Sequence, residues 1–126
     1  MAYNQNTADR IREFLFERNI EFQEKAMFGA LCFMLNDKML CGTRIDKQTN
    51  EDLLLCRVGE EVHEKVIEDN DVLPMGSNGR TMKGFVFVTE NAHQKQKDLE
   101  HWLQLCLDHN PFAKSNLPKK NKSIKS

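Results

Sequence analysis

Four basic side chains lie within or beside apolar segments that have the character of buried β-strands. They are Lys25, Arg57, Arg80 and Lys83. Arg57 directly follows the run "LLLC", while Arg80 and Lys83 come just before "FVFV". Guanidinium and ammonium groups gathered at one edge of a sheet bind carboxylates and phosphates. Basic residues at strand ends also guard those ends, or pair with nearby acids, here Glu24, Glu60 or Glu61. The sequence leaves both interpretations open.

The histidines and cysteines give no support to a metal or catalytic centre. His101 and His109 are eight residues apart, which separates their backbones by about 12 Å along one helix, too far for one metal ion. His63 is flanked by glutamates, and we expect it on a solvated helix face. No nucleophile elbow or phosphate-binding loop is present. We therefore predict no enzymatic activity, no metal and no cofactor.

The cysteines are best interpreted as small core residues. None of them shows CxxC spacing, and each lies among apolar neighbours, which is typical of buried thiols in a reducing compartment. They are Cys32, Cys41, Cys56 and Cys106.

Periodicity predicts the elements that must position the basic residues. The first is a helix from about Thr7, its N-cap, to Arg18, closed by Asn19 in a left-handed conformation. Strands are expected at 22–29, within 30–45 as a hairpin, at 52–59, at 72–75 as an edge strand and at 83–88. Helices are expected at 60–70 and along the apolar stripe from Leu99 to Leu107.

These elements make an α+β domain with one antiparallel or mixed sheet of about five strands flanked by three helices, in the order α-β-β-β-α-β-β-α. We expect the domain to span residues 1–112 and to be followed by a disordered, lysine-rich tail at 113–126. Gly84 is expected to let another backbone approach the last strand closely.

The expected hairpin has consequences for pairing and for burial. A turn at 36–37 would put Leu35 opposite Lys38, Met34 opposite Met39, and Cys32 opposite Cys41; these three pairs follow from the spacing of the two runs. Both faces of the hairpin are apolar, whereas a sheet with one wet face alternates. The sheet must therefore be covered on both faces, by the helices or by another chain, and we predict a homodimer.

Composition limits the function classes. The 126 residues are 40% hydrophobic and 29% charged, with a formal net charge of -1, so we expect contacts with nucleic acid to be at most weak or indirect. No apolar run approaches the roughly 20 residues that span a bilayer. The N-terminus lacks the pattern of a signal peptide, which predicts a cytoplasmic protein without membrane contact.

Several motifs resemble one family. "KAMFGALCFMLNDKMLCG", "LLLCRVG", "LPM", "GRTMKGFVFV" and "LEHWLQLCL" occur in that order and are similar to the TfoX/Sxy N-terminal domain family of bacteria, named for regulators of natural competence. The most specific are Met27-Phe28-Gly29, Arg57-Val58-Gly59 and Gly79-Arg80-x-Met82-Lys83-Gly84. The resemblance covers residues 2–107.

The resemblance implies a single sheet flanked by helices, with no known enzymatic activity and no established cofactor. It covers half of a competence regulator, which has a second domain. We therefore expect a non-enzymatic cytoplasmic regulatory or interaction domain that acts through an unknown protein partner. The alternative is a small-ligand or anion-binding module that uses Arg57, Arg80 and Lys83.

Overall fold

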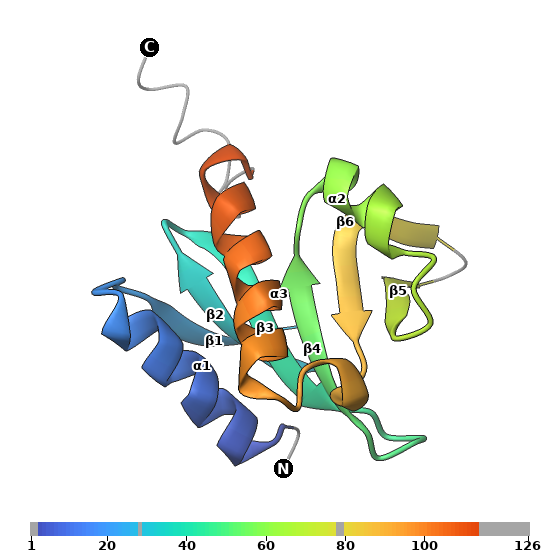
Figure 1. The fold of residues 1–126 in the computed structure, drawn as a ribbon, viewed down its shortest axis with the longest axis horizontal. Coiled ribbons are helices and arrows are strands. Elements are labelled where there is room, and N and C mark those ends of the chain that lie inside the picture. Colours follow the sequence, from blue (N-terminus) through green and yellow to red (C-terminus); the bar gives the residue numbers. More distant parts are fainter. Residues whose placement is uncertain (1–2, 28, 78–79, 114–126) are drawn as a thin grey trace.

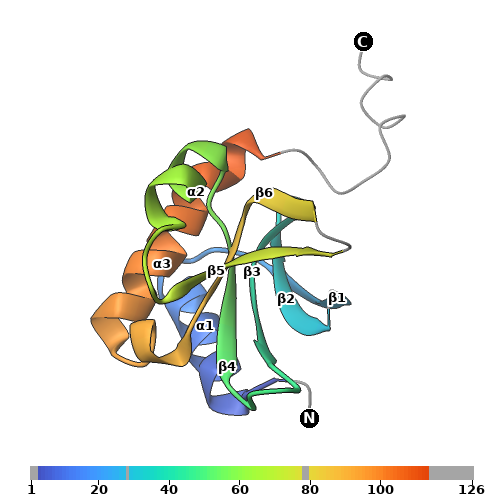
Figure 2. The same cartoon turned by 90° about the vertical axis from the view of Figure 1, so that its right-hand side faces the viewer.

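One antiparallel sheet with helices on a single face forms the fold (Figures 1 and 2). The computed structural model describes residues 3–27, 29–77 and 80–113. Its α-helices are α1 (Gln5–Glu17), α2 (Glu60–Val66) and α3 (Gln96–His109), and two 3₁₀ turns, η1 (Glu90–Ala92) and η2 (Asn110–Phe112), flank α3. The strands are β1 (Gln23–Met27), β2 (Ala30–Leu35), β3 (Lys38–Ile45), β4 (Asp52–Arg57), β5 (Val72–Ser77) and β6 (Arg80–Val88).

The predicted α+β class and the order of elements are confirmed, with six strands instead of about five. In the sheet the strands lie in the order β1-β2-β3-β4-β6-β5, and every neighbouring pair is antiparallel. The strands β4 and β6, which carry three of the four predicted basic residues, are therefore direct neighbours. Of the predicted tail at 113–126, Ala113 is buried, and 114–126 lie outside the described residues.

The start of α1 differs from the prediction. Asn4, not Thr7, is the N-cap, and its side-chain oxygen accepts hydrogen bonds from the backbone N–H groups of Asn6 and Thr7 at 2.8 and 3.1 Å. Thr7 lies inside the first turn, and its hydroxyl donates to the buried Asp52 carboxylate at 2.6 Å. The other end agrees with the prediction, since Asn19 has a φ of 56°.

The β2–β3 hairpin has the predicted turn but not the predicted register throughout. Leu35 faces Lys38 and Met34 faces Met39, but the register then shifts, so that Cys41 faces Phe33 and Cys32 faces Gly42. The prediction that Cys32 pairs with Cys41 is therefore wrong. A β-bulge inserts one extra residue, Leu40, into β3, and this turns Cys41 toward the helices, away from Cys32. On β4, Cys56 is the partner of Cys41.

The two faces of the sheet are buried in different ways. All three helices lie on one face (Figure 2), where α1 and α3 pack on aliphatic and aromatic side chains of the sheet. In the described part of the chain, no helix lies over the other face, and the sheet bends strongly there (Figure 2). Buried side chains of β2 to β6 pack on one another on this face. This second cluster comprises Ala30, Cys32, Met34, Met39, Leu53, Leu55, Met75 and Phe87. Both faces are thus covered within one chain, and the homodimer remains a prediction.

All four cysteines are buried free thiols, as expected of core residues. Burial raises the pKa of the Cys32 thiol to about 11, and the pKa values of Cys41 and Cys56 also rise because burial disfavours the thiolate. Thiols in this state are poor nucleophiles.

A buried polar cluster holds the entry to α3. The Asp52 carboxylate accepts hydrogen bonds from Thr7 of α1 and, at 2.9 Å, from Thr43 of β3. His93, which lies between η1 and α3, places Nε2 2.9 Å from the backbone oxygen of Asp52. These bonds join α1, β3, β4 and the segment before α3, and so fix the helix whose far end reaches the site described next.

Candidate functional site

Arg57 and Lys83 meet at the end of β4. Arg57 is the last residue of β4, and its register partner on β6 is Phe85, two residues after Lys83. Both basic residues line a cavity of about 390 Å³, here called the basic pocket. The remaining residues that line the basic pocket are Gly59, Glu60, Gly84, Phe85, His109, Phe112 and Ala113.

The other two predicted site residues are placed differently. Lys25 is exposed on β1, the edge strand that lies three positions from β4 in the sheet, so it does not join the basic pocket. Arg80 begins β6, where its backbone pairs with Ser77 of β5; its side chain lies outside the described part of the chain.

Two glycines shape the backbone around the basic pocket. The N–H groups of Val58 and Gly59 both donate to the carbonyl oxygen of Gly84, at 2.8 and 3.1 Å. Gly84 has a φ of +93°, and a Cβ there would lie 3.4 Å from the carbonyl carbon of Gly59. The two backbones thus lie close together, as predicted, but a Cβ at Gly84 would make only an ordinary contact, so the positive φ is what favours glycine here. This approach brings the end of β4 against β6 and sets Arg57 beside Lys83.

Arg57 carries its charge in a partly desolvated position. Its guanidinium carbon lies 5.0 Å from the centre of the Phe85 ring, a cation–π contact. Burial lowers the pKa of Arg57 from its ordinary value, but an arginine remains charged at neutral pH. A desolvated cation attracts an anion more strongly than a fully hydrated cation does.

Two further residues lie near the basic pocket: Lys38, which adds positive charge to this region, and His109, which lines the pocket. His109, at the end of α3, packs so tightly on Gly59 that a Cβ on that glycine would lie 2.5 Å from the ring Nδ1. Burial lowers the pKa of His109, and the charges of Arg57 and Lys38 lower it further. Lys38 also donates to the carbonyl oxygens of Asn110 and Pro111, at 3.1 and 3.5 Å, just after α3.

The sequence interpretation missed both residues. It considered His109 only as half of a metal pair with His101, yet a cation near the C-terminal end of a helix is a known signal for contact with the last carbonyls. The feature that brings His109 to the basic pocket is the crossing of α3 over the sheet (Figure 1), which local periodicity does not encode.

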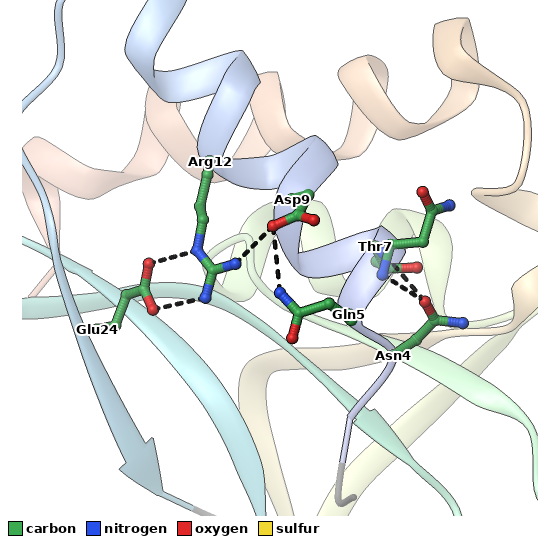
Figure 3. Close-up of polar contacts among 7 residues, drawn as sticks. Asn4, Gln5, Thr7, Asp9, Arg12 and Glu24 are labelled. Atoms are coloured by element: carbon green, nitrogen blue, oxygen red, sulfur yellow. Dashed lines mark hydrogen bonds and ion pairs between the residues drawn. The ribbon is translucent and has the colours of Figure 1, made fainter.

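One of the acids that could neutralise the predicted cations is held elsewhere. Glu24 makes a two-pronged contact with Arg12 of α1, at 2.7 and 2.8 Å, and Arg12 also bonds Asp9 at 2.7 Å (Figure 3). Glu60 lines the basic pocket itself.

The family comparison bears directly on this geometry. The family model described as the TfoX N-terminal domain matches residues 15–110. The chain belongs to the TfoX N-terminal domain family. No curated protein and no solved structure matches it.

In this TfoX N-terminal domain, two of the three motifs that carry the resemblance meet at the basic pocket. Arg57-Val58-Gly59 supplies the end of β4, and Met82-Lys83-Gly84 supplies the facing part of β6. Hydrogen bonds to the Gly84 carbonyl join the two. The motif residues are thus placed together in space although 25 positions separate Gly59 from Gly84.

The TfoX N-terminal domain family is not known as an enzyme family. Within residues 3–27, 29–77 and 80–113, no three histidine, cysteine, aspartate or glutamate side chains converge as a metal site. His63, predicted on a solvated face, is in fact buried, with 6% exposed, because α2 turns it inward on the side where Val66 and Ile67 pack on the core. In the described part of the chain, every helix is too short or too polar to cross a bilayer.

Proposed function

We propose that this TfoX N-terminal domain is a non-enzymatic regulatory domain that binds an acidic group of a protein partner in the basic pocket. The observation that carries the proposal is the convergence of Arg57 and Lys83, from neighbouring strands, on one cavity beside His109. Burial lowers the pKa of His109, and the nearby charges of Arg57 and Lys38 lower it further. A carboxylate bound in the basic pocket offsets part of that positive charge and receives charge-assisted hydrogen bonds.

A protein partner is favoured over nucleic acid for two reasons. The net charge of -1 gives no general attraction to a phosphate backbone. Beside the cations, Phe112 leaves 80% of its surface exposed, and exposed aromatic side chains are enriched at protein interfaces. Four buried free thiols are consistent with action in the cytoplasm.

The experiment is a calorimetric titration with a capped acidic hexapeptide, Glu-Leu-Glu-Glu-Leu-Glu, and its glutamine counterpart. The test variant is Arg57→Gln with Lys83→Gln. Lys25→Gln is the control, since it removes a lysine charge from a strand at the far edge of the sheet. We expect the test variant to bind the acidic peptide at least about tenfold more weakly, because hydrogen bonds to charged groups are lost. Lys25→Gln should bind like the wild type.

Two results would overturn the proposal: no binding of the acidic peptide to the wild-type protein, or an equal loss per charge in the Lys25 variant. The second result would show that binding follows net charge alone.

A free small anion is the second candidate, and the pocket volume favours it. A cavity of about 390 Å³ falls within the range of small-ligand sites, roughly 300–1,000 Å³. Inorganic phosphate and glutarate titrated against the same variants separate the candidates. Binding of either anion as tightly as the peptide, with the same dependence on Arg57 and Lys83, would favour the small ligand.

A further inference from the structure

A second cavity adjoins the basic pocket between α2 and α3. It has a volume of about 520 Å³ and is here called the acidic pocket. Its floor is apolar, with Val58 buried and both Val62 and Leu105 packed partly against the core. The carboxylates at this cavity are those of Glu60, Glu61 and Asp108.

The two cavities form one groove because they share a wall. Four residues line both: Gly59, Glu60, His109 and Phe112. The elements that carry the groove lie side by side, with the end of α3 next to α2 and to the start of β6 (Figure 1). Along the groove the lining changes from Glu61 and Asp108 at one end to Arg57 and Lys83 at the other. Between them lie residues that both cavities share, which include Glu60 and the exposed Phe112 ring.

Each acid also has a local role. Glu60 and Glu61 occupy the first turn of α2, where negative charge stabilises a helix. The Asp108 carboxylate accepts a hydrogen bond from Gln104 at 2.9 Å. These roles explain why each residue is acidic, but they do not require two helices to present carboxylates around one apolar hollow. That hollow continues into a cavity of opposite charge.

From this charge order we infer that the groove binds an extended segment of the partner that carries a basic residue, then an apolar residue, then an acidic residue. The inference rests on the proposed function, because the acidic residue is the group placed in the basic pocket. The apolar residue packs on Phe112, and the basic residue lies over the apolar floor with its charge near Glu61 and Asp108. Charge complementarity of this kind fixes the register of a bound segment.

The test compares two sets of capped peptides on the full-length protein. One set is Lys-(Ser)n-Leu-Glu-Glu with spacers of zero to three serines, and the other has glutamine in place of lysine. The protein variants are Glu61→Gln with Asp108→Asn, and a control pair, Glu13→Gln with Glu17→Gln, both exposed on α1. The control pair changes the net charge equally, away from the groove.

For at least one spacer, we expect the lysine peptide to bind the wild type about two- to fivefold more tightly than its glutamine counterpart, the effect of ion pairs at an interface rim. The advantage should vanish in the Glu61/Asp108 variant and persist in the Glu13/Glu17 variant. The wild-type comparison reveals the lysine effect without any variant, and the two variants then decide whether Glu61 and Asp108 cause it.

The failures are distinguishable. If neither peptide set binds, the proposed function itself is wrong. If glutamine peptides bind as tightly as lysine peptides at every spacer, the basic pocket binds acids but the inference about the acidic pocket is wrong. If the lysine peptides still bind the Glu61/Asp108 variant more tightly than the glutamine peptides do, general charge attraction explains the difference and the inference is wrong. Self-association that this variant abolishes would identify the occupant as a second copy of the chain, and would also overturn it.

Discussion

Arg12 and Arg57 both lie next to the sheet, yet the molecule treats them in opposite ways. Arg12 is held by two carboxylates, Glu24 and Asp9, and the hydrogen bonds that it donates to Glu24 raise its pKa (Figure 3). Arg57 lies in the wall of the basic pocket, and burial lowers its pKa. Arg12 therefore fastens α1 to β1, whereas Arg57 lies over the Phe85 ring in the wall of the basic pocket, with its charge partly desolvated.

The difference shows how a basic residue at a strand can be assigned a role. A structural cation has carboxylates built around it, so its charged form is stabilised within the fold. A binding cation is placed where burial and neighbouring cations disfavour charge, and an incoming anion restores the balance. In this domain the lowered pKa of His109, caused by burial and then by Arg57 and Lys38, marks the second situation.

The largest effect is expected from Gly59→Ala, which disrupts the packing of His109 in the wall of the basic pocket. Gly59 has a φ of +90°, and an added Cβ would lie 2.5 Å from His109 Nδ1. We expect a loss of about 2–3 kcal/mol in the free energy of unfolding, measured with urea, from backbone strain together with displacement of the ring.

Gly29→Ala is the matched control for that strain. Gly29 also has a positive φ, +69°, but an added Cβ would lie 3.7 Å from its nearest neighbour, an ordinary contact. Its cost should be only about 1 kcal/mol, since strain acts alone. Equal losses in the two variants would contradict the tight packing of His109 on Gly59.

A smaller effect is expected from Arg12→Gln, which removes the contacts of Arg12 with Glu24 and Asp9, here called the Arg12 clamp. Its contacts with Glu24 are short and two-pronged, but both side chains are about 30% exposed, so the loss should be about 0.5–1 kcal/mol in urea unfolding. Binding of the acidic peptide should not change. A loss of peptide affinity in this variant would show that the Arg12 clamp and the basic pocket are not independent.

The smallest effect is a difference in pH dependence, which separates the two regions. Because the pKa of His109 is lowered in the folded protein, the unfolded chain binds a proton on this histidine more readily. The contribution of His109 to the free energy of unfolding is therefore complete above pH 6.5, its ordinary pKa, and decreases as the pH falls below 6.5. The hydrogen bond from Arg12 lowers the pKa of Glu24. The contribution of Glu24 to the free energy of unfolding is therefore complete above pH 4.5 and is lost at more acidic pH. Stability measured from pH 8 to 3 should therefore lose the two contributions in sequence.

Variants assign the two steps. His109→Gln should flatten the decline just below pH 6.5, and Arg12→Gln should flatten part of the decline below pH 4.5. Parallel curves for His109→Gln and the wild type between pH 7 and 5.5 would show that the folded protein does not disfavour the histidine cation.

Much of the fold could be predicted from the sequence because it depends on local patterns. The helical stripes, the hairpin turn and the apolar runs predicted the element order. His63 was placed on the wrong face of its helix, although its spacing of three and four residues from Val66 and Ile67 is typical of one buried helix face. The bulge at Leu40 could not be predicted, since the register depends on how β3 packs between two strands and under the helices.

The site could be predicted only in part for the same reason. Arg57 and Lys83 were identified because each adjoins an apolar run, and the sheet order makes their strands neighbours. Lys25 has the same local pattern, but β1 ends up at the far edge of the sheet. His109 arrives from a helix that crosses the sheet, a long-range feature.

The most direct test of the central claim is the pKa of His109, measured by NMR titration with and without saturating acidic hexapeptide, and assigned with His109→Gln. Burial is the largest cause of the lowered pKa of His109, and the charges of Arg57 and Lys38 lower it further; an anion held by Arg57 and Lys83 offsets this second contribution. The pKa should therefore lie below 6.5 in the free protein and rise on binding, and Arg57→Gln should raise it without peptide. A pKa at or above 6.5 in the free protein, or one that the bound peptide leaves unchanged, would contradict the assignment of this pocket as an acid-binding site.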